Sequence, residues 1–258
     1  MKSLNNIGFI GLGTMGGPMA GHLINQGYKL FVFNRSKEKT EKWSSKYIAG
    51  NVCSSLKELA INCQIIILCV GNDTDVRTII NEIFDSLNPA TIIIDHTTTS
   101  AQLSMEMQDL VNKKDSFFLD APISGGEIGA QKGSLSVMIG GNKEAYLSIK
   151  KILEAYSNYS KFMGPSGHGQ LTKMVNQICI AGLIQSLAEG LHFSKKAGLE
   201  TEDVIEVISK GAAQSWQMDN RWKSMIGDDY NHGFAVDLMR KDLDIVLKHA
   251  KTVDANLE

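Results

Sequence analysis

A glycine cluster near the N-terminus has the residue types and spacing of a phosphate-binding turn. Residues 7–20, IGFIGLGTMGGPMA, join a short apolar run to glycines at positions 11, 13 and 16, in the pattern G-x-G-x-x-G. In a strand–turn–helix unit the first glycine permits the sharp turn, the second lets backbone approach a pyrophosphate, and the third lets the helix pack closely on the strand. The helix N-terminus then faces the phosphates with unpaired N–H groups. The predicted cofactor loop, for which a purely structural glycine turn is the alternative, comprises Gly11, Leu12, Gly13, Thr14, Met15 and Gly16.

The end of the next apolar run bears on which dinucleotide is bound. Residues 29–33 predict the second strand, and Asn34, Arg35 and Ser36 follow it. An acidic residue there would bind the ribose 2′-hydroxyl and repel a 2′-phosphate, whereas these residues offer a positive charge and hydrogen-bond donors. The pattern favours NADP(H). NAD(H) stays possible, because Arg35 is alternatively an ordinary solvated charge of the loop.

A lysine with two amide neighbours is the candidate for proton transfer. Lys173, Asn176 and Gln177 stand at positions i, i+3 and i+4 of an apolar helical stretch, so they share one face. Desolvation and the positive end of the helix dipole should lower the pKa of this lysine toward neutrality, where it can donate or accept a proton. The alternative is a lysine whose ammonium group reaches water.

Small residues that follow a proline form a third candidate site. Pro122 ends a predicted strand, and Ser124, Gly125 and Gly126 come directly after it. Successive backbone N–H groups of such residues can converge on an anion, and the hydroxyl of Ser124 is a further donor. A substrate carboxylate fits this loop. The alternative is a glycine-rich β-turn without a ligand.

Short apolar runs separated by helical segments predict the elements that position these residues. Residues 65–70 and 91–95 are β-branched runs, too short for helices and apolar on both faces, as a parallel sheet covered on both sides requires. Further strands are predicted near residues 117–119 and 136–139. An open α/β sheet binds its ligand at the carboxyl ends of its strands. The residues predicted at that edge are Val70, Gly71 and Asn72 after the first run, and His96, Thr97, Thr98 and Thr99 after the second.

The pattern changes to long helical stretches after Gly164-Pro165. We therefore predict an α/β fold in two domains: a Rossmann-type doubly wound parallel sheet at residues 1–164, and an all-α C-terminal domain at residues 165–258. Its long first helix, near residues 170–197, is apolar around much of its circumference, as burial between two domains requires. Shorter helices are predicted at residues 202–209 and 215–226.

A last amphipathic helix is predicted over residues 236–251. Its spacing predicts burial of Met239, Leu243, Val246 and Leu247. By spacing alone, Lys241 and Asp242 belong to a solvated face.

Composition argues against several classes of partner. The 258 residues carry a formal charge of −2, without the basic footprint that nucleic acid or an anionic membrane selects. No 18 unbroken apolar residues occur, and the six histidines show no metal-binding spacing, so we expect neither a membrane span nor a metal. Four cysteines lack C-x-x-C spacing, and Cys69 and Cys179 are expected to be reduced core residues, as suits a cytoplasmic protein.

Four motifs in order along the chain resemble the β-hydroxyacid dehydrogenase family. They are FIGLGTMGGPMA, DAPISGG with the glycines that follow it, GHGQLTKMVNQ, and the late pair Lys241-Asp242. The resemblance implies a Rossmann domain, a long interdomain helix and a helical C-terminal domain that mediates homodimers or homotetramers. It also implies hydride transfer between NADP(H) or NAD(H) and a small β-hydroxy acid or semialdehyde acid, of the 3-hydroxyisobutyrate dehydrogenase type.

The resemblance assigns a role to each matching position. Lys173 corresponds to the catalytic lysine, and Thr98 and Lys241 correspond to cofactor contacts. The positions that correspond to substrate-binding residues are Ser124, Gly125, Gly126, Asn176, Gln177 and Asp242.

The sequence departs from the family pattern at two places. His22 stands where the family usually has asparagine, a change that we expect to affect helix packing more than chemistry. The sequence also stops at Glu258, short of the terminal helices of the family, so the resemblance implies an incomplete helical domain. Two alternatives keep the fold: a non-catalytic NADP-binding module, against which Lys173 argues, and an imine-reducing relative, which should carry a different proton donor.

Overall fold

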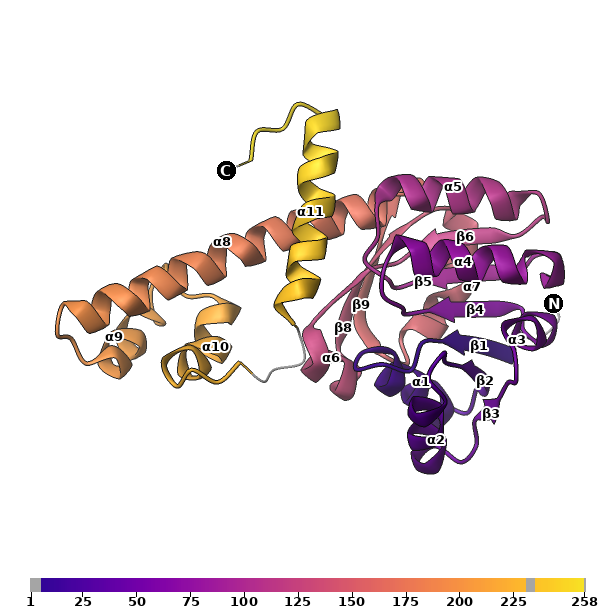
Figure 1. Ribbon diagram of the computed structural model, residues 1–258, viewed down its shortest axis with the longest axis horizontal. Coiled ribbons are helices and arrows are strands. Elements are labelled where there is room, and N and C mark those ends of the chain that lie inside the picture. The colour runs from indigo at the N-terminus through magenta and orange to yellow at the C-terminus, as the bar shows by residue number, and fades with distance from the viewer. Residues whose placement is uncertain (1–5, 231–234, 258) are drawn as a thin grey trace. The chain divides into compact units, whose positions relative to one another are not determined.

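The protein is described by a computed structural model that covers residues 6–230 and 235–257. The chain divides into two compact units, and Figure 1 labels their elements. The first unit comprises the residues up to Lys173 together with those from Leu247 onward, and the second comprises Met174–Val246.

The first unit is built on one sheet with the strand order β3-β2-β1-β4-β5-β6-β8-β7, in which β9 also pairs with β8. The strands from β3 to β6 are parallel, whereas β8 runs antiparallel to β6 and β7. The strands are β1 (Asn6–Ile10), β2 (Lys29–Phe33), β3 (Asn51–Val52), β4 (Ile65–Leu68), β5 (Ile92–Asp95), β6 (Phe117–Asp120), β7 (Ile123–Ser124), β8 (Leu135–Gly140) and β9 (Ser157–Gly164). The order reverses between β1 and β4, which is where a doubly wound sheet opens a crevice for its ligand.

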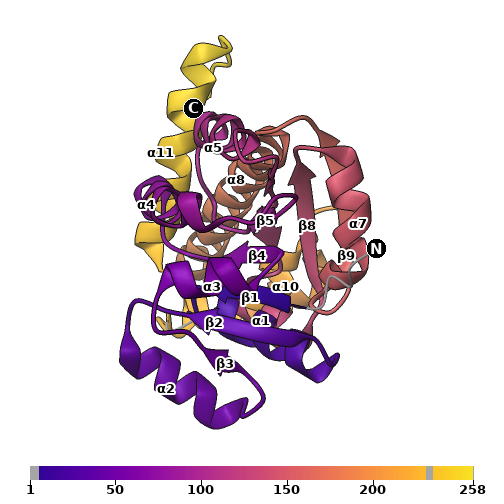
Figure 2. The same cartoon turned by 90° about the vertical axis from the view of Figure 1, so that its right-hand side faces the viewer.

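Helices cover both faces of this sheet, as Figure 2 shows. One core layer contains side chains of α1, α6 and α7, and the opposite layer contains side chains of α3, α4 and α5. The helices are α1 (Gly16–Asn25), α2 (Lys37–Lys46), α3 (Leu56–Asn62), α4 (Asp73–Ile83), α5 (Ala101–Asn112), α6 (Gly126–Lys132) and α7 (Lys143–Leu153), with the 3-10 turn η1 at Phe84–Ser86.

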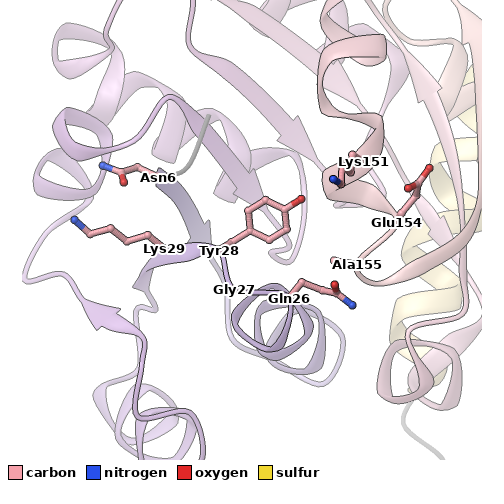
Figure 3. Close-up of a pocket in the computed structure, with 8 residues that line it drawn as sticks. All are labelled: Asn6, Gln26, Gly27, Tyr28, Lys29, Lys151, Glu154 and Ala155. Atoms are coloured by element: carbon pink, nitrogen blue, oxygen red, sulfur yellow. The ribbon is translucent and has the colours of Figure 1, made fainter. Parts of the chain in front are cut away.

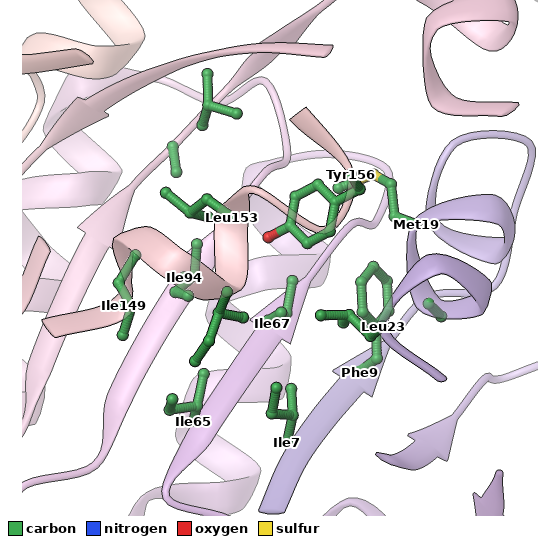
Figure 4. Close-up of a cluster of buried hydrophobic side chains, with 14 of the residues drawn as sticks. Ile7, Phe9, Met19, Leu23, Ile65, Ile67, Ile94, Ile149, Leu153 and Tyr156 are labelled. Atoms are coloured by element: carbon green, nitrogen blue, oxygen red, sulfur yellow. The ribbon is translucent and has the colours of Figure 1, made fainter. Parts of the chain in front are cut away.

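Alternation along the central strands explains why they are apolar throughout. Ile65 and Ile67 of β4 enter one core layer, and Ile66 and Leu68 enter the other. Because successive side chains of a strand point to opposite faces, a sheet covered on both sides needs apolar residues at every position. Figure 4 shows the first layer, where Tyr156 and helix α1 lie beside β1 and β4. The predicted Rossmann-type α/β fold is therefore confirmed.

The second unit is helical. It contains most of α8 (His168–Lys196), α9 (Thr201–Ile208), α10 (Trp216–Ile226) and the first part of α11 (Val236–Thr252). A small core is formed by Leu187 and Leu191 of α8 with Ile205 and Met218, and Trp222 packs against it.

The described helices include none with the length and apolarity that a membrane crossing needs.

Two predictions about burial on α8 are wrong. One side of α8 is exposed rather than buried: Val175 is 60% exposed, and Ile178, Leu183 and Ile184 are also exposed. Cys179 lies one turn after Val175 on that helix and is exposed too, so it is not a core residue. The apolar surface of α8 is therefore wider than the part of it that other described residues pack against.

The predicted pattern of α11 is also only partly correct. Val246 is buried and Met239 and Leu243 are half-buried, but Leu247 is exposed. Asp242, which spacing placed on a solvated face, is buried, and it accepts a hydrogen bond from Gln177 of α8 that offsets the cost of this burial.

Candidate functional site

The glycine loop between β1 and α1 has different constraints at its three glycines. Gly11 has φ +101°, and a Cβ there would overlap the carbonyl oxygen of Cys69. A Cβ on Gly16 would overlap the carbonyl oxygen of Gly11, so helix and strand approach too closely for any side chain. A Cβ on Gly13, in contrast, would meet no atom within 4 Å. Gly11 and Gly16 are required by the fold, and Gly13 leaves open space in front of the loop.

This loop fits a pyrophosphate. Met15, the N-terminal capping residue of α1, gives the helix no side-chain hydrogen bond, so no side chain of its own occupies the first N–H groups. Such groups, together with the helix dipole, bind anions. The open space at Gly13 is the space that the backbone of a dinucleotide would fill.

The three residues that follow β2, Asn34, Arg35 and Ser36, make different contacts. Asn34 binds the protein's own backbone: its Oδ1 accepts from the Leu12 N–H at 2.9 Å, and its Nδ2 donates to the Ser36 carbonyl at 3.0 Å. Ser36 Oγ accepts from the Lys39 N–H and caps α2. The side chain of Arg35 is 90% exposed and lies 3.3 Å from Asp75 Oδ1. The sequence predicted a set of donors, and the structure adds that Asn34 joins the two loops while Arg35 carries an exposed charge.

Loops after β4 and β5 lie at the same edge of the sheet. The Val70 N–H donates to Thr97 Oγ1 at 3.1 Å, which ties these two loops together. Asn72 caps α4 by accepting from the Asp75 N–H at 3.0 Å. Gly71 and Thr98 belong to these loops, so the predicted cofactor residues after β4 and β5 follow adjacent parallel strands.

The start of α8 is held by a buried carboxylate that the sequence analysis did not single out. Asp120, at the end of β6, accepts from the Gly167 N–H at 2.8 Å and from the Gln170 N–H at 2.9 Å. Burial raises the pKa of Asp120, although these hydrogen bonds oppose the shift. Lys173 follows one turn after Gln170 and is only 7% exposed. The candidate proton donor therefore stands on a helix whose first turn is fixed to the sheet.

Residues 124–126 form the turn that leads from β7 into α6. Gly125 and Gly126 have φ +129° and +61°, values that favour glycine, and a Cβ on Gly126 would meet no atom within 4 Å. At the other end of α6, His22 Nε2 lies 3.0 Å from the Ala130 carbonyl oxygen. His22 therefore joins α1 to α6, and its expected effect on helix packing is confirmed.

The four late polar residues form one cluster in the second unit. Gln177 Nε2 donates to Asp242 Oδ2 at 2.6 Å, and Asn176 Nδ2 donates to Gln177 Oε1 at 2.8 Å. Lys241 Nζ lies 3.1 Å from Asp242 Oδ1. The structure thus brings together residues that the sequence analysis took from two separate motifs.

Comparison with protein families matches two models to residues 6–258. The model for the NAD binding domain of 6-phosphogluconate dehydrogenase matches residues 6–166, and that for the NAD-binding of NADP-dependent 3-hydroxyisobutyrate dehydrogenase matches residues 167–258. The chain belongs to the β-hydroxyacid dehydrogenase family. Membership of this family makes the protein an oxidoreductase that takes a nicotinamide dinucleotide.

Individual relatives of the family are similar over most of their length. An uncharacterized oxidoreductase of Shewanella frigidimarina is 48% identical over 254 residues, which cover 97% of this chain and 87% of the relative. The mitochondrial 3-hydroxyisobutyrate dehydrogenase of Drosophila melanogaster is 32% identical over 246 residues, covering 92% of this chain and 75% of the relative. A solved structure of 3-hydroxyisobutyrate dehydrogenase from Mycobacterium tuberculosis with L-serine has a TM-score of 0.89 at 26% identity, covering 98% of this chain and 89% of that one.

Sequence reasoning missed a buried polar layer beneath the candidate site of this family member. Asp95 and Asp120 are the last residues of β5 and β6 and pair in register. The next residue after β5, His96, donates through Nδ1 to the Ala121 carbonyl at 2.6 Å, and its Nε2 lies 2.9 Å from the Tyr156 hydroxyl. Burial lowers the pKa of His96 to about 4, so this histidine is neutral and structural. The sequence did contain an indication of this layer, since each of the two aspartates directly ends an apolar run that forms a strand.

Asp95 should make stability depend on pH. Its Oδ1 accepts from the Thr97 N–H at 3.0 Å, while Oδ2 has no hydrogen-bond partner among the described residues. Burial raises its pKa to about 7, although the hydrogen bonds to Thr97 oppose this. Between pH 4 and 7 the folded state keeps a proton that the unfolded state releases, so stability falls as pH rises, by at most about 1.4 kcal/mol per pH unit.

Asp95→Asn keeps the Oδ1 acceptor and cannot ionise. Its free energy of unfolding, relative to wild type, should therefore increase between pH 4 and pH 7. Urea unfolding of both proteins at pH 4, 5.5 and 7 measures this difference. A difference that stays constant with pH would show that Asp95 does not hold the proton.

One surface hollow lies away from the candidate site. It has a volume of about 710 Å³ and is lined mostly by polar and charged residues at the amino ends of β1 and β2 and at the carboxyl end of α7, as Figure 3 shows. Its lining residues are Asn6, Gln26, Gly27, Tyr28, Lys29, Lys151, Glu154 and Ala155. A doubly wound sheet binds its ligand at the carboxyl ends instead, so we do not assign this hollow to the cofactor. Among the described residues, no group of three or more His, Cys, Asp or Glu side chains is placed to hold a metal.

Proposed function

We propose that the protein is an NADP(H)-dependent dehydrogenase that reduces a small semialdehyde acid or 2-oxo acid to the hydroxy acid. The observation that carries this proposal is Lys173, which is buried one turn after the part of α8 that Asp120 fixes to the sheet. The same compact unit holds the dinucleotide loop. A buried lysine in a fixed position suits proton transfer better than it suits packing.

The proposed chemistry divides between the cofactor and the chain. When bound, the nicotinamide dinucleotide supplies the hydride that reduces the carbonyl carbon. Lys173 Nζ donates a proton to the carbonyl oxygen and stabilises the negative charge that develops there. In the direction of oxidation the same nitrogen accepts the proton from the hydroxyl group.

Other residues orient the reactants. Residues 11–16 hold the pyrophosphate, and Thr98 lies on the side of the nicotinamide. Ser124, Gly125 and Gly126 hold the substrate carboxylate with N–H groups and a hydroxyl. The cluster of Asn176, Gln177, Lys241 and Asp242 supplies the further substrate and cofactor contacts.

Assembly and location belong to the same proposal. We propose that the protein forms a homodimer or homotetramer, which the exposed apolar side chains of α8 support. We also propose a cytoplasmic location, which the free cysteines support.

The test of the function is a spectrophotometric screen. Oxidation of NADPH and NADH is followed with glyoxylate, succinic semialdehyde, tartronate semialdehyde and methylmalonate semialdehyde as substrates. The proposal expects turnover with at least one of them and faster turnover with NADPH. Binding of NADPH without turnover of any substrate would favour a non-catalytic module instead.

Arg35 provides a separate prediction about the cofactor. Arg35 forms an ion pair with Asp75, and an exposed pair of this kind is worth at most about 1 kcal/mol, so the guanidinium can turn to a 2′-phosphate. Arg35→Ala should weaken NADPH binding by about 1.5–3 kcal/mol and leave NADH binding nearly unchanged.

Fluorescence titration of both cofactors measures the effect. Lys42→Ala, which removes an exposed cation from α2, is the control for a general change of charge. Equal losses of NADPH and NADH affinity in Arg35→Ala would contradict the assignment.

A further inference from the structure

We infer that Gln170 is a positioning residue: its side-chain amide fixes the loop at residues 97–99 to the first turn of α8 and thereby holds Thr98 in place relative to Lys173. This inference rests on the proposed function, because it gives that chemistry its alignment. Gln170 is fully buried, and all residues of the argument belong to the first compact unit.

The amide nitrogen of Gln170 faces a hydrogen-bond acceptor, and its amide oxygen faces a donor. Gln170 Nε2 donates to the Thr97 carbonyl oxygen at 2.7 Å, and Gln170 Oε1 accepts from the Thr99 N–H at 3.1 Å. The two backbone groups flank Thr98 on either side. If the amide were turned over, donor would face donor and acceptor would face acceptor, so this orientation is determined by the contacts themselves.

The loop and the helix are each anchored elsewhere as well. Thr97 Oγ1 accepts from the Val70 N–H, and the Thr97 N–H donates to Asp95. The backbone N–H of Gln170 donates to Asp120 Oδ2 at 2.9 Å. Gln170 therefore joins two structures that are already fixed to the sheet, and its side chain sets their spacing.

The position of Gln170 on the helix connects this contact to the proton donor. Gln170 and Lys173 stand at i and i+3, so their side chains leave the same face about one turn apart. In the proposed function Thr98 lies beside the nicotinamide, which supplies the hydride, and Lys173 supplies the proton. The Gln170 amide aligns the loop that carries Thr98 with the helix that carries Lys173. Burying a glutamine is costly unless both its oxygen and its nitrogen form hydrogen bonds. Packing alone would not need an amide here, whereas the contact with the loop does.

Two substitutions separate alignment from packing. Gln170→Leu keeps much of the volume but leaves the Thr97 carbonyl and the Thr99 N–H without their partner. We expect it to lower kcat about 10- to 100-fold, because small misplacements of reacting groups have effects of this size. The NADPH dissociation constant should change less than about threefold, since residues 11–16 and Arg35 are untouched.

Gln170→Glu adds a signature that depends on pH. The ionised carboxylate places an oxygen against the Thr97 carbonyl oxygen, whereas the protonated acid can donate to that carbonyl and accept from Thr99. The ratio of kcat in Gln170→Glu to kcat in wild type should therefore rise as pH falls. In Gln170→Leu the ratio should not depend on pH, because leucine does not titrate.

Amide hydrogen exchange at Thr99 tests the contact without any turnover. Exchange should become at least about tenfold faster in Gln170→Leu, because the N–H loses its acceptor. Gln217→Leu is the matched control, since Gln217 is nearly as buried but lies on α10, and it should change neither Thr99 exchange nor kcat.

The outcomes separate this inference from the function on which it rests. Unchanged Thr99 exchange in Gln170→Leu would overturn the contact, and faster exchange with wild-type kcat would overturn its positioning role. A wild-type protein that turns over none of the screened substrates would refute the proposed function, while Thr99 exchange would still decide the contact.

Discussion

Lys173→Met should lower kcat for the reduction about 10²- to 10⁴-fold, which is the usual contribution of a general acid. Methionine keeps the length and the packing of the lysine side chain but cannot donate a proton. Lys173 is buried, so water cannot easily replace the missing ammonium group at the substrate oxygen. NADPH affinity should be nearly unchanged, because the dinucleotide loop lies on β1 and α1 rather than on α8.

Single-turnover oxidation of NADPH, together with NADPH binding by fluorescence, makes this measurement. Lys195→Met is the control, because it removes an exposed lysine near the other end of the same helix and should leave kcat unchanged. Lys173→Ala should behave like Lys173→Met if the role is chemical, and differently if the side chain only fills space. Wild-type turnover in Lys173→Met would exclude this lysine from the mechanism.

The parts of the fold that could be predicted are those in which local pattern and tertiary structure agree. The β-branched runs of β4 and β5 are apolar because both faces of the sheet are covered, and no helix of that length would be stable alone. In the edge strand β9 only the first residue, Ser157, is buried, and β3 and β7 have two residues each. These strands were not predicted, because neighbouring strands rather than their own sequence define them.

The candidate site shows the same limit. The glycine loop was predicted because its glycine spacing and the apolar run before it lie in one short stretch of chain, although Gly11 is also constrained by the distant Cys69 carbonyl oxygen. The roles of Asp120 and Gln170 depend on partners 50 and 71 residues away, which no local spacing reveals. Asp242 was assigned to a solvated face for the same reason, since its partner Gln177 is 65 residues away. The residue types were visible in the sequence, but the contacts that give them roles were not.

Gly13→Val should abolish most dinucleotide binding while leaving the fold intact. A Cβ at this position meets no protein atom within 4 Å, and its φ lies outside the region that favours glycine. The free energy of unfolding without cofactor should therefore change by no more than about 0.5 kcal/mol. The valine methyl groups would occupy the space proposed for the pyrophosphate, so NADPH affinity should fall about 100-fold, or about 2.7 kcal/mol.

Gly16→Ala is the matched substitution, with the opposite expected result. Its Cβ would overlap the Gly11 carbonyl oxygen and approach the Phe9 ring, and backbone cannot move aside as a flexible side chain can. We expect a loss of about 3 kcal/mol in the free energy of unfolding, measured by urea denaturation without cofactor. The smaller side chain should thus damage the fold, and the larger one should damage only binding. If Gly13→Val bound NADPH like wild type, the pyrophosphate would not lie at this loop, and the glycines would serve the packing of α1 on β1 alone.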